Sequence, residues 1–539
     1  MTRLSKRMVW VFAAFCILFF GLNLRMAYLQ NSESLQQAAV SQRSYTLDVG
    51  ITRGQIYDRN LLGMVNQVKK TQAAILPMPE NTQAVLNSVL PQQRSSVLEQ
   101  LKNRLPFVTT LTDSTLKMDG VTLIPTVERY PEKQLAAHVL GYVNGDGEGV
   151  SGIEKAYNDY LKQAEKTVQA RYTLDGLGNP IGGTQAEVLN SGEVNQGVVL
   201  TIDQGIQQIC EEVGKPLIDK GAIVVMDPYT GELLACASFP EYSPNHVEKS
   251  LNDEDAPLIN RCFSAFTVGS TFKTVLCAAA LKQGISPDLS YDCIGWINVK
   301  GQPFKCHYLP GHGQIDMKTA MVESCNTYFI SLGQTLGAQS IYQMAKDMSF
   351  GQGYELAPGL YTAAGNLPTA AQMPNPADVA NISFGQGTLT ATPVQLCQMI
   401  SCVVNDGKTP VPQLVKGLTA DGVTMLESYE PKAPVYAVDA EITQIIKGFL
   451  DAAVNEKDGI AAKPEHVTAA GKTGTAQTGK FKEDGTEIVD TWFAGYFPKE
   501  EPKYVVSVLV QDGSTGNLSA GPVFAEIADK VTAYLDSGN

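Results

Sequence analysis

Three short polar motifs stand far apart in this chain of 539 residues, and each opens or interrupts an apolar segment. They are Ser-Thr-Phe-Lys at 270–273, Ser-Cys-Asn at 324–326 and Lys-Thr-Gly at 472–474. Each motif alone is a weak signal. Together they supply a serine, an amine beside it, a polar pair and a cationic strand, which is the set of groups for acyl transfer through a serine ester. The fold must therefore bring three distant stretches into one cleft.

The first motif predicts a buried helix with a serine in its first turn. Gly269 precedes Ser270, and the alanine-rich segment 274–281 ends before Gly284. Residues three apart share a helix face, so Ser270 Oγ and Lys273 Nζ can meet. Apolar neighbours disfavour the ammonium and leave an amine that can take the serine proton, while free N–H groups at the helix start can hold an oxyanion. An N-cap serine beside a surface lysine is the alternative interpretation.

The second motif places Ser324 and Asn326 directly before an apolar segment, 327–332, which can fix them over the site. An ordinary helix cap is the alternative. Similar patterns occur elsewhere in the chain. Ser114–Lys117 has the same pattern as the first motif, but it lies in a polar stretch with no buried helix after it. The position between the other two motifs is what favours Ser324 and Asn326.

The third motif, with Thr475 after it, interrupts a predicted strand. Gly474 has no side chain, so a substrate backbone can approach and pair with the strand edge. Thr473 and Thr475 offer hydroxyls, and Lys472 offers a positive charge for a carboxylate. The alternative is an exposed strand with a solvated lysine.

Composition and charge exclude some classes of function. Hydrophobic residues make up 44% and charged residues 18%, as in ordinary globular proteins, and the length allows two or three domains. A formal net charge of −14 without a basic stripe argues against a nucleic-acid partner. The segment 147–152 matches the dinucleotide fingerprint, but a strongly charged helix and no Val-rich parallel strand follow it. We therefore expect no nucleotide and no cofactor.

The N-terminus predicts a single-pass membrane anchor. Arg3–Arg7 contains three basic residues, and the run Met8–Leu22 is apolar; with the next two residues it reaches the lower limit of about 17 for a span. Basic residues before a span place the N-terminus in the cytoplasm, and the rest of the chain then lies outside the cell membrane. A cleaved signal peptide is the alternative, but no small-x-small cleavage site follows the run.

Nine of the ten cysteines follow the predicted anchor, so complete pairing is impossible. Cys293 and Cys306 flank a loop and can pair, and whether they do stays open. With His307 and His312 they suggest a zinc site, but the spacing fits no standard finger, so no metal is predicted. Six others lie in apolar stretches and are expected to be small buried hydrophobes: Cys210, Cys236, Cys262, Cys277, Cys397 and Cys402.

The pattern of apolar runs and turns after residue 196 predicts an antiparallel sheet packed by helices. The runs 222–226 and 233–238 enclose a turn and indicate a hairpin, and 198–202 is a further strand. Helical stretches dominate from about 270 to 405. Strands return at 467–477, 491–497 and 504–511, and an amphipathic helix follows at about 522–536.

These patterns together indicate a multidomain α+β protein. The expected parts are a cytoplasmic tail and transmembrane helix at 1–28, a mixed α/β domain at 29–195, and the domain with the antiparallel sheet at 196–539.

The chain resembles class B penicillin-binding proteins over nearly its whole length. Val268 and Leu61 depart from the family pattern, which commonly has proline and glycine there, but neither residue touches a reacting group. The segments that carry the resemblance, beside the three motifs, are Arg53–Asn60, Arg129–Pro131, Ala137–Gly141 and Gly149–Glu154 for the non-catalytic pedestal, and Phe384–Gly387 and Trp492–Pro498 near the active site.

The resemblance implies a membrane-anchored D,D-transpeptidase of peptidoglycan, with a penicillin-binding/β-lactamase-like fold and a pedestal, of the dimerisation type, at 29–195. It implies stem peptides ending in D-Ala-D-Ala as substrates and β-lactams as inhibitors. It also implies partners: a polytopic glycosyltransferase of the shape, elongation, division and sporulation (SEDS) family and other wall-synthesis proteins. The cellular role would be division, elongation or sporulation.

The resemblance also implies roles for individual residues. Ser270 would be the nucleophile, Lys273 the base, and Ser324 a proton relay toward the leaving amine, with Lys472 close by. The oxyanion would lie on backbone N–H groups of Ser270 and Thr475. Substrate binding would fall to Asn326, Thr473, Gly474 and Thr475.

Two other classes of function stay open. A scaffold of a wall-synthesis complex could dispense with Lys273 and Lys472, and both are present. A β-lactam receptor would need a cytoplasmic signalling region, for which seven residues before the span are too few. A β-lactamase or carboxypeptidase would use the same groups with water, but would need no pedestal.

Overall fold

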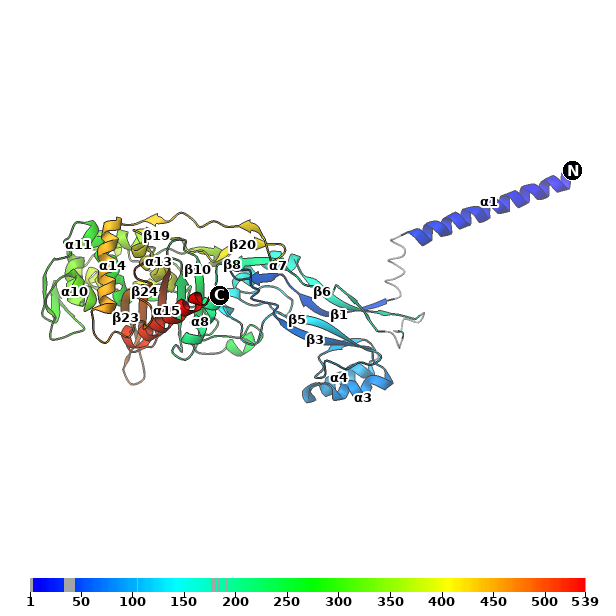
Figure 1. Ribbon diagram of the computed structural model, residues 1–539, viewed down its shortest axis with the longest axis horizontal. Coiled ribbons are helices and arrows are strands. Elements are labelled where there is room, and N and C mark those ends of the chain that lie inside the picture. The colour runs from blue at the N-terminus through cyan, green and yellow to red at the C-terminus, as the bar shows by residue number, and fades with distance from the viewer. Residues whose placement is uncertain are drawn as a thin grey trace. The chain divides into compact units, whose positions relative to one another are not determined.

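The structure, a computed structural model, describes residues 3–32, 44–103, 105–175, 181, 185–190 and 192–538. Its contacts divide the chain into two units (Figure 1). Unit 1 consists of Met1–Arg53, Asn66–Arg129 and Glu165–Val194; unit 2 consists of Gly54–Val65, Tyr130–Ala164 and Asn195–Asn539. The predicted domain at 29–195 is thus interrupted twice by segments of unit 2, and its boundaries stay a prediction.

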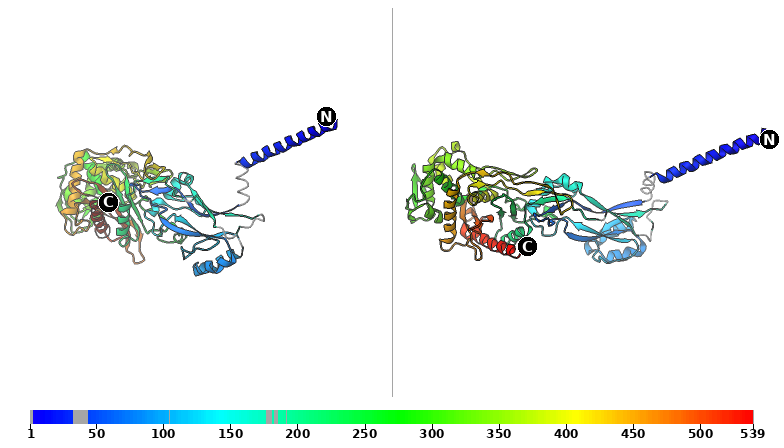
Figure 2. Two further views of the ribbon diagram at one scale, coloured as in Figure 1. Left: turned by 45° about the vertical axis from the view of Figure 1, so that its right-hand side comes forward. Right: turned by 45° about the horizontal axis from the view of Figure 1, so that its top comes forward.

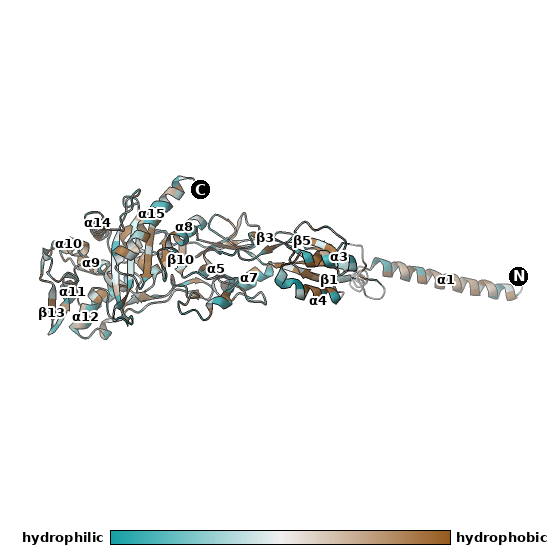
Figure 3. Ribbon diagram, turned by 90° about the horizontal axis from the view of Figure 1, so that it is seen from below, coloured by the Kyte–Doolittle hydropathy of each residue, from teal (hydrophilic) through white to brown (hydrophobic). Residues whose placement is uncertain are grey.

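Helix α1 (Arg3–Asn31) is the one helix among the described residues that is long and apolar enough to cross a membrane. At about 1.5 Å per residue its 29 residues exceed a hydrocarbon core of about 30 Å. None of its side chains is buried within the protein, and Figure 3 shows the hydrophobic residues along it. A single N-terminal apolar helix is consistent with a single-pass anchor.

Beside α1, the described part of unit 1 contains two small antiparallel sheets and two short α-helices. Strand alternation places Ala73 and Ile75 against Val85 and Val97 of the helices, which closes a small core. One sheet has the order β1-β6-β7 and the other β4-β3-β5. The elements are β1 (Ser44–Thr52), β3 (Val68–Ile75), α3 (Pro79–Asn87), α4 (Arg94–Lys102), β4 (Phe107–Thr109), β5 (Val121–Glu128), β6 (Lys166–Thr173) and β7 (Glu187–Leu189).

The central sheet of unit 2 has the strand order β10-β9-β25-β24-β23, and every neighbouring pair is antiparallel. The predicted hairpin and the three C-terminal strands are confirmed as its members. Among the described strands β23 pairs with β24 alone, so β23 is an edge strand of the sheet. The bounds are β9 (Gly221–Met226), β10 (Leu233–Phe239), β23 (Ala470–Phe481), β24 (Glu487–Phe497) and β25 (Tyr504–Gln511).

Helices cover both faces of this sheet, as the views in Figures 1 and 2 let the reader follow. Side chains alternate along the strands, so Ile223 and Val225 face α8 (Gln204–Gly214) and α15 (Gly521–Asp536). Val224 and Met226 face the other way, into the larger core. That core also contains α9 (Lys273–Lys282), α11 (Asn326–Asp347), α13 (Pro393–Val404) and α14 (Ala440–Asn455). The predicted α+β fold class is confirmed.

Strand β8 (Gly197–Leu200) forms but does not join the central sheet. It pairs in parallel with β2 (Gln55–Tyr57) and antiparallel with β20 (Val415–Thr419), which also pairs with β21 (Met425–Ser428). The strand pattern alone could not reveal these partners, because they come from distant segments of the chain. The six cysteines expected to be small buried hydrophobes are all buried.

A helical lobe follows α9 and carries several small hairpins. Its strands β12 and β15 pair with each other, as do β13 and β14. The bounds are β12 (Tyr291–Cys293), β13 (Trp296–Val299), β14 (Gln302–Lys305), β15 (Gly313–Ile315), α10 (Met317–Val322) and α12 (Pro376–Ser383).

Candidate active site

The serine motif lies on a 3₁₀ turn, Gly269–Phe272, that leads directly into α9. Gly269 has φ +63°, which favours glycine, and its N–H donates to Gly385 O at 2.9 Å. A Cβ on Gly269 would lie 2.6 Å from Thr475 O, so the turn packs backbone to backbone against the edge strand. Ser270 is half-buried and lines a cavity of about 870 Å³.

Lys273 begins α9, and its side chain is completely buried. Its Nζ donates to Ser324 O and Asn326 Oδ1, both at 2.7 Å, and lies 3.2 Å from Ser324 Oγ. Burial, and secondarily the charge of Lys472, lowers the pKa of Lys273 well below its ordinary value. A neutral amine can make both donations and keep a lone pair, so Lys273 is equipped to accept a proton.

Ser324 lies in the turn between α10 and α11 with φ +54°, a left-handed backbone that is uncommon for a residue other than glycine. Helix α10 ends just before it, and Cys325 N donates to Ala320 O at 2.9 Å to close the turn. Asn326 then begins α11. The turn therefore aims the Ser324 and Asn326 side chains at the same lysine amine. Backbone strain of this kind is found at functional sites.

The lysine–threonine–glycine motif lies on the edge strand β23. A Cβ on Gly474 would lie 2.9 Å from Thr271 Cγ2 and 3.0 Å from Val268 O, so the glycine lets the strand approach the serine turn. This reason differs from the predicted one, which was access for a substrate. Thr473 is half-buried, and the exposed Thr475 accepts from Gly516 N–H at 3.1 Å.

Lys472 is 2% exposed, so its ammonium loses hydration. This burial, with repulsion from Lys457, lowers the pKa of Lys472 to about 7, against an opposing attraction to Glu323. Lys457 and Glu323 form an ion pair at 2.8 Å on the cavity wall. Near neutral pH the Lys472 charge is therefore sensitive to any anion that enters the cavity.

The structure brings all eight predicted site residues together. Seven of them line the cavity. Lys273 lies behind the cavity wall and is hydrogen-bonded to Ser324 and Asn326. Within the described chain no hydrogen bond joins Ser270 Oγ to Lys273 Nζ, the two atoms that were expected to be able to meet. The seven residues on the wall are Ser270, Ser324, Asn326, Lys472, Thr473, Gly474 and Thr475.

Other wall residues were missed by sequence reasoning. Glu323 and Lys457 carry charges next to Lys472, and Gln386 and Asn381 add amide groups. Gln386 belongs to the Phe384–Gly387 segment, so a signal for it existed. Lys457 had none, since it lies in a polar loop that none of the motifs includes.

Alternative patterns fall outside the cavity. Ser114 and Lys117, which imitate the serine motif, are both exposed in unit 1. Cys293 and Cys306 are free thiols, so no bridge closes the loop between them.

Residues 221–529 match the family model of the penicillin binding protein transpeptidase domain. Stage V sporulation protein D of Bacillus subtilis (strain 168) is 28% identical over 555 residues, which cover 96% of this chain and 83% of that protein. Peptidoglycan D,D-transpeptidase MrdA of Escherichia coli (strain K12) is 26% identical over 575 residues, which cover 92% and 89%.

A solved structure has the same fold. The crystal structure of the D,D-transpeptidase domain of a peptidoglycan glycosyltransferase from Eggerthella lenta matches with a TM-score of 0.64 and 24% identity, covering 90% of this chain and 99% of that one. The family model alone spans more than half of the chain. The chain therefore belongs to the family of the penicillin-binding protein transpeptidase domain.

Proposed function

We propose that the protein is a peptidoglycan D,D-transpeptidase of cell-wall synthesis in which Ser270 is the nucleophile. The observation that carries this assignment is the completely buried Lys273 amine, bonded to Ser324 and Asn326 beside a cavity that Ser270 lines. A serine hydroxyl is a poor nucleophile without an adjacent base, and an uncharged amine is such a base.

In the acylation step, Ser270 Oγ attacks the carbonyl carbon of the penultimate D-Ala of a stem peptide. Lys273 Nζ takes the hydroxyl proton as the Oγ–C bond forms. Lys273 then returns this proton to the departing nitrogen through the hydroxyl of Ser324, whose Oγ lies 3.2 Å from the amine, so the peptide C–N bond breaks and D-Ala leaves as a neutral amine. The products are a serine ester and free D-Ala.

Substrate orientation follows from the polar groups on the wall. Asn326 holds the substrate amide, while Thr473 and Thr475 hold the terminal carboxylate in the field of Lys472. The edge strand β23 can pair with an extended peptide, as edge strands do in β-augmentation. We assign the oxyanion to the backbone N–H groups of Ser270 and Thr475.

In the second step an amine of a neighbouring stem peptide attacks the ester carbonyl and gives up a proton to Lys273 Nζ. Lys273 passes this proton to Ser270 Oγ as the ester C–O bond breaks. The new amide is the cross-link. A β-lactam enters by the same first step: its ring amide opens on Ser270, and the leaving nitrogen stays attached to the adduct.

The membrane arrangement is part of the proposal. Helix α1 anchors the chain, with its basic end in the cytoplasm and the cavity on the other side, where peptidoglycan is built. The partners would be a polytopic SEDS-family glycosyltransferase and other wall-synthesis proteins, as the resemblance of the pedestal motifs implies.

The test is a coupled assay of the purified full chain with a stem peptide ending in D-Ala-D-Ala and an amine acceptor. We expect release of D-Ala together with cross-linked product. Both are lost in Ser270→Ala, in Lys273→Ala, and in Lys273→Arg, because guanidinium cannot give up its proton. Release of D-Ala without cross-linked product would identify a hydrolase, and full rescue of a deletion strain by Ser270→Ala would identify a scaffold.

A further inference from the structure

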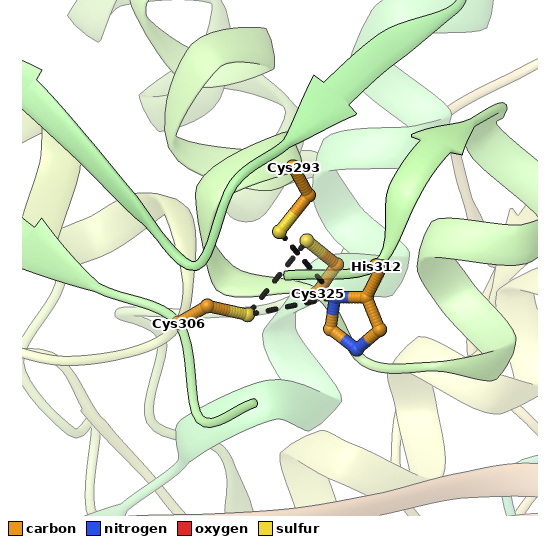
Figure 4. Close-up of side chains that lie close together, drawn as sticks. All are labelled: Cys293, Cys306, His312 and Cys325. Atoms are coloured by element: carbon orange, nitrogen blue, oxygen red, sulfur yellow. Dashed lines mark hydrogen bonds between the residues drawn. The ribbon is translucent and has the colours of Figure 1, made fainter. Parts of the chain in front are cut away.

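Four metal-ligating side chains converge directly behind the Ser324–Asn326 turn (Figure 4). Cys293 ends β12, Cys306 follows β14, His312 precedes β15, and Cys325 stands between Ser324 and Asn326. Their ligand atoms all lie within 4.8 Å of one another. The three cysteines are free thiols and are at most 2% exposed.

The distances between these atoms fit one ion at their centre. Zinc takes thiolate sulfur at about 2.3 Å and imidazole nitrogen at about 2.0 Å, so a tetrahedral site has S···S edges of about 3.8 Å and S···N edges of about 3.5 Å. Cys306 Sγ lies 3.9 Å from Cys325 Sγ, and His312 Nδ1 lies 3.4 Å from Cys293 Sγ and 3.7 Å from Cys306 Sγ.

The surroundings also differ from those of an ordinary buried cysteine. Thr327 Oγ1 donates to Cys293 Sγ at 3.1 Å and lies 3.3 Å from Cys325 Sγ, which is a contact that stabilises thiolates. The loops that carry the ligands meet backbone to backbone: a Cβ on Gly311 would collide with Cys293 O, and Cys306 N donates to Gly295 O at 2.9 Å.

We infer that the protein binds one Zn²⁺ through Cys293, Cys306, His312 and Cys325. Binding converts three thiols to thiolates and releases three protons, and the imidazole coordinates through Nδ1 in its neutral form. Three thiolates and one imidazole complete a four-coordinate set, which is typical of a structural rather than a catalytic zinc site. The linear spacing predicted no such site because it offered His307 as the fourth ligand and left out Cys325.

The ion would act as a positioning site for the transpeptidase, and this role rests on the proposed function. Cys325 is the neighbour of both Ser324 and Asn326, the two residues that hold the Lys273 amine. The segment Gln302–His307, which includes one ligand, lines the cavity wall. Zinc would therefore fix the turn over Lys273 and one wall of the cavity at once, with no contact to the substrate.

The first test measures metal, not activity. We expect the reduced full chain, purified in detergent and dialysed against zinc-free buffer, to contain about one zinc per molecule by mass spectrometry, as the four-ligand set requires. His312→Ala is expected to lose at least about tenfold in zinc occupancy. His307→Ala is the matched control, since its ring lies 3.9 Å from Cys306 Sγ but outside the cluster, and it is expected to retain the ion.

Zinc near zero in the reduced wild type, even after reconstitution, or equal zinc in wild type and His312→Ala would overturn the assignment. If His312→Ala does not fold, replacement of zinc by Co²⁺ in the wild type decides: thiolate-to-cobalt charge transfer and the strong visible bands of tetrahedral Co²⁺ are expected, and their absence contradicts the site.

The positioning role is tested by chelation. Removal of zinc from the wild type is expected to slow acylation by a β-lactam about tenfold to a hundredfold, and added Zn²⁺ to restore it, because small displacements of catalytic groups have effects of that size. An unchanged acylation rate would overturn the positioning role. If the zinc-loaded chain never forms an adduct, the proposed function fails while the metal site stands.

Discussion

The two buried lysines of the site, Lys273 and Lys472, have different surroundings. Lys273 faces oxygen atoms of Ser324 and Asn326, so it is suited to exchange protons with hydroxyl groups. Lys472 borders the cavity near Thr473, where a cation can hold a carboxylate. Burial disfavours both ammonium groups, which lowers the pKa of each and destabilises the folded chain.

Replacing Lys472 by methionine is expected to raise stability while impairing function. The pKa of Lys472 is about 7 when folded against an ordinary 10.5, so between these values the unfolded chain binds more protons and stability rises with pH. The gain in Lys472→Met is therefore full below about pH 7, at most about 5 kcal/mol, and fades toward pH 10.5. Thermal unfolding at pH 6 and pH 10 measures it. Lys480→Met, an exposed site on the same strand, is the control; an equal gain in both variants, or one that grows with pH, would contradict the account.

The pH profile of β-lactam acylation should depend on Lys457. Under the proposed function Lys472 must be protonated to hold the carboxylate, so acylation at low β-lactam concentration is expected to fall as pH rises through its pKa. Burial is the main cause of this lowered pKa, and repulsion from Lys457 adds to it. Lys457→Gln removes the repulsion, so the falling limb is expected to move to higher pH. Lys318→Gln removes a charge outside the cavity and leaves the limb in place. A limb that stays fixed in Lys457→Gln, or moves to lower pH, would exclude this role.

At the scale of elements, the site lies where three backbone segments approach one another closely: the serine turn, the edge strand β23 and the loop after α12. A glycine in each segment allows this approach. Gly269 N–H donates to Gly385 O, and Gly474 lies against the serine turn. These contacts explain why glycines stand next to Ser270 and Thr473. They position Ser270 through packing and not through contact with substrate.

Two neighbouring glycines separate this packing from simple backbone strain. Gly385 and Gly387 have φ values of +77° and +84°, so alanine is strained at both. A Cβ on Gly385 would collide with Gly269 O, whereas one on Gly387 would only contact Asn381 Cβ at 3.5 Å. We expect Gly385→Ala to slow β-lactam acylation at least about tenfold and Gly387→Ala to have a smaller effect. Acylation time courses with quenched samples would measure both rates. Equal rates in the two variants would show that backbone strain alone, and not the contact with Gly269, accounts for the loss.

The sequence predicted the elements whose signals are local. The hairpin 222–238, the C-terminal strands and the buried helix after Ser270 rest on alternation, a turn and an alanine run, and all are present. The convergence of Ser324 and Asn326 on Lys273 instead depends on a left-handed turn, and the partners of β8 depend on long-range pairing. Cys325 and Cys293 are distant in the sequence and become neighbours through the fold, so residue spacing could not identify the cluster. The position of Lys457 on the cavity wall likewise depends on the fold and could not be read from residue spacing.

At the scale of the whole molecule, each of the two units is built from segments that are not consecutive in the sequence. Segments 54–65 and 130–164 belong to unit 2, although unit 1 surrounds them in sequence. Within unit 2, β2 pairs with β8, and Gly54 N donates to Leu161 O at 3.0 Å. Several motifs that carried the pedestal resemblance lie in these segments, so they contribute to the structure of unit 2.

Helix α1 gives a prediction for the intact chain. Its exposed apolar side chains have no partner helix among the described residues, so the full chain is expected to pellet with membranes and resist an alkaline wash. A variant without residues 3–31 is expected in the supernatant. Protease added outside intact spheroplasts is expected to digest unit 2 of the full chain. Protection of unit 2 would contradict the proposed orientation, and alkaline release of the full chain would contradict the anchor.

The most direct measurement is the site of covalent attachment of a β-lactam to the intact chain. Incubation followed by intact-mass and peptide mass spectrometry is expected to show one drug molecule per chain, attached at Ser270 within the peptide that also contains Lys273. Ser270→Ala is expected to abolish the adduct, and Ser114→Ala, at the exposed imitation of the motif, to leave it unchanged. An adduct on any other residue, or one that persists in Ser270→Ala, would contradict the account.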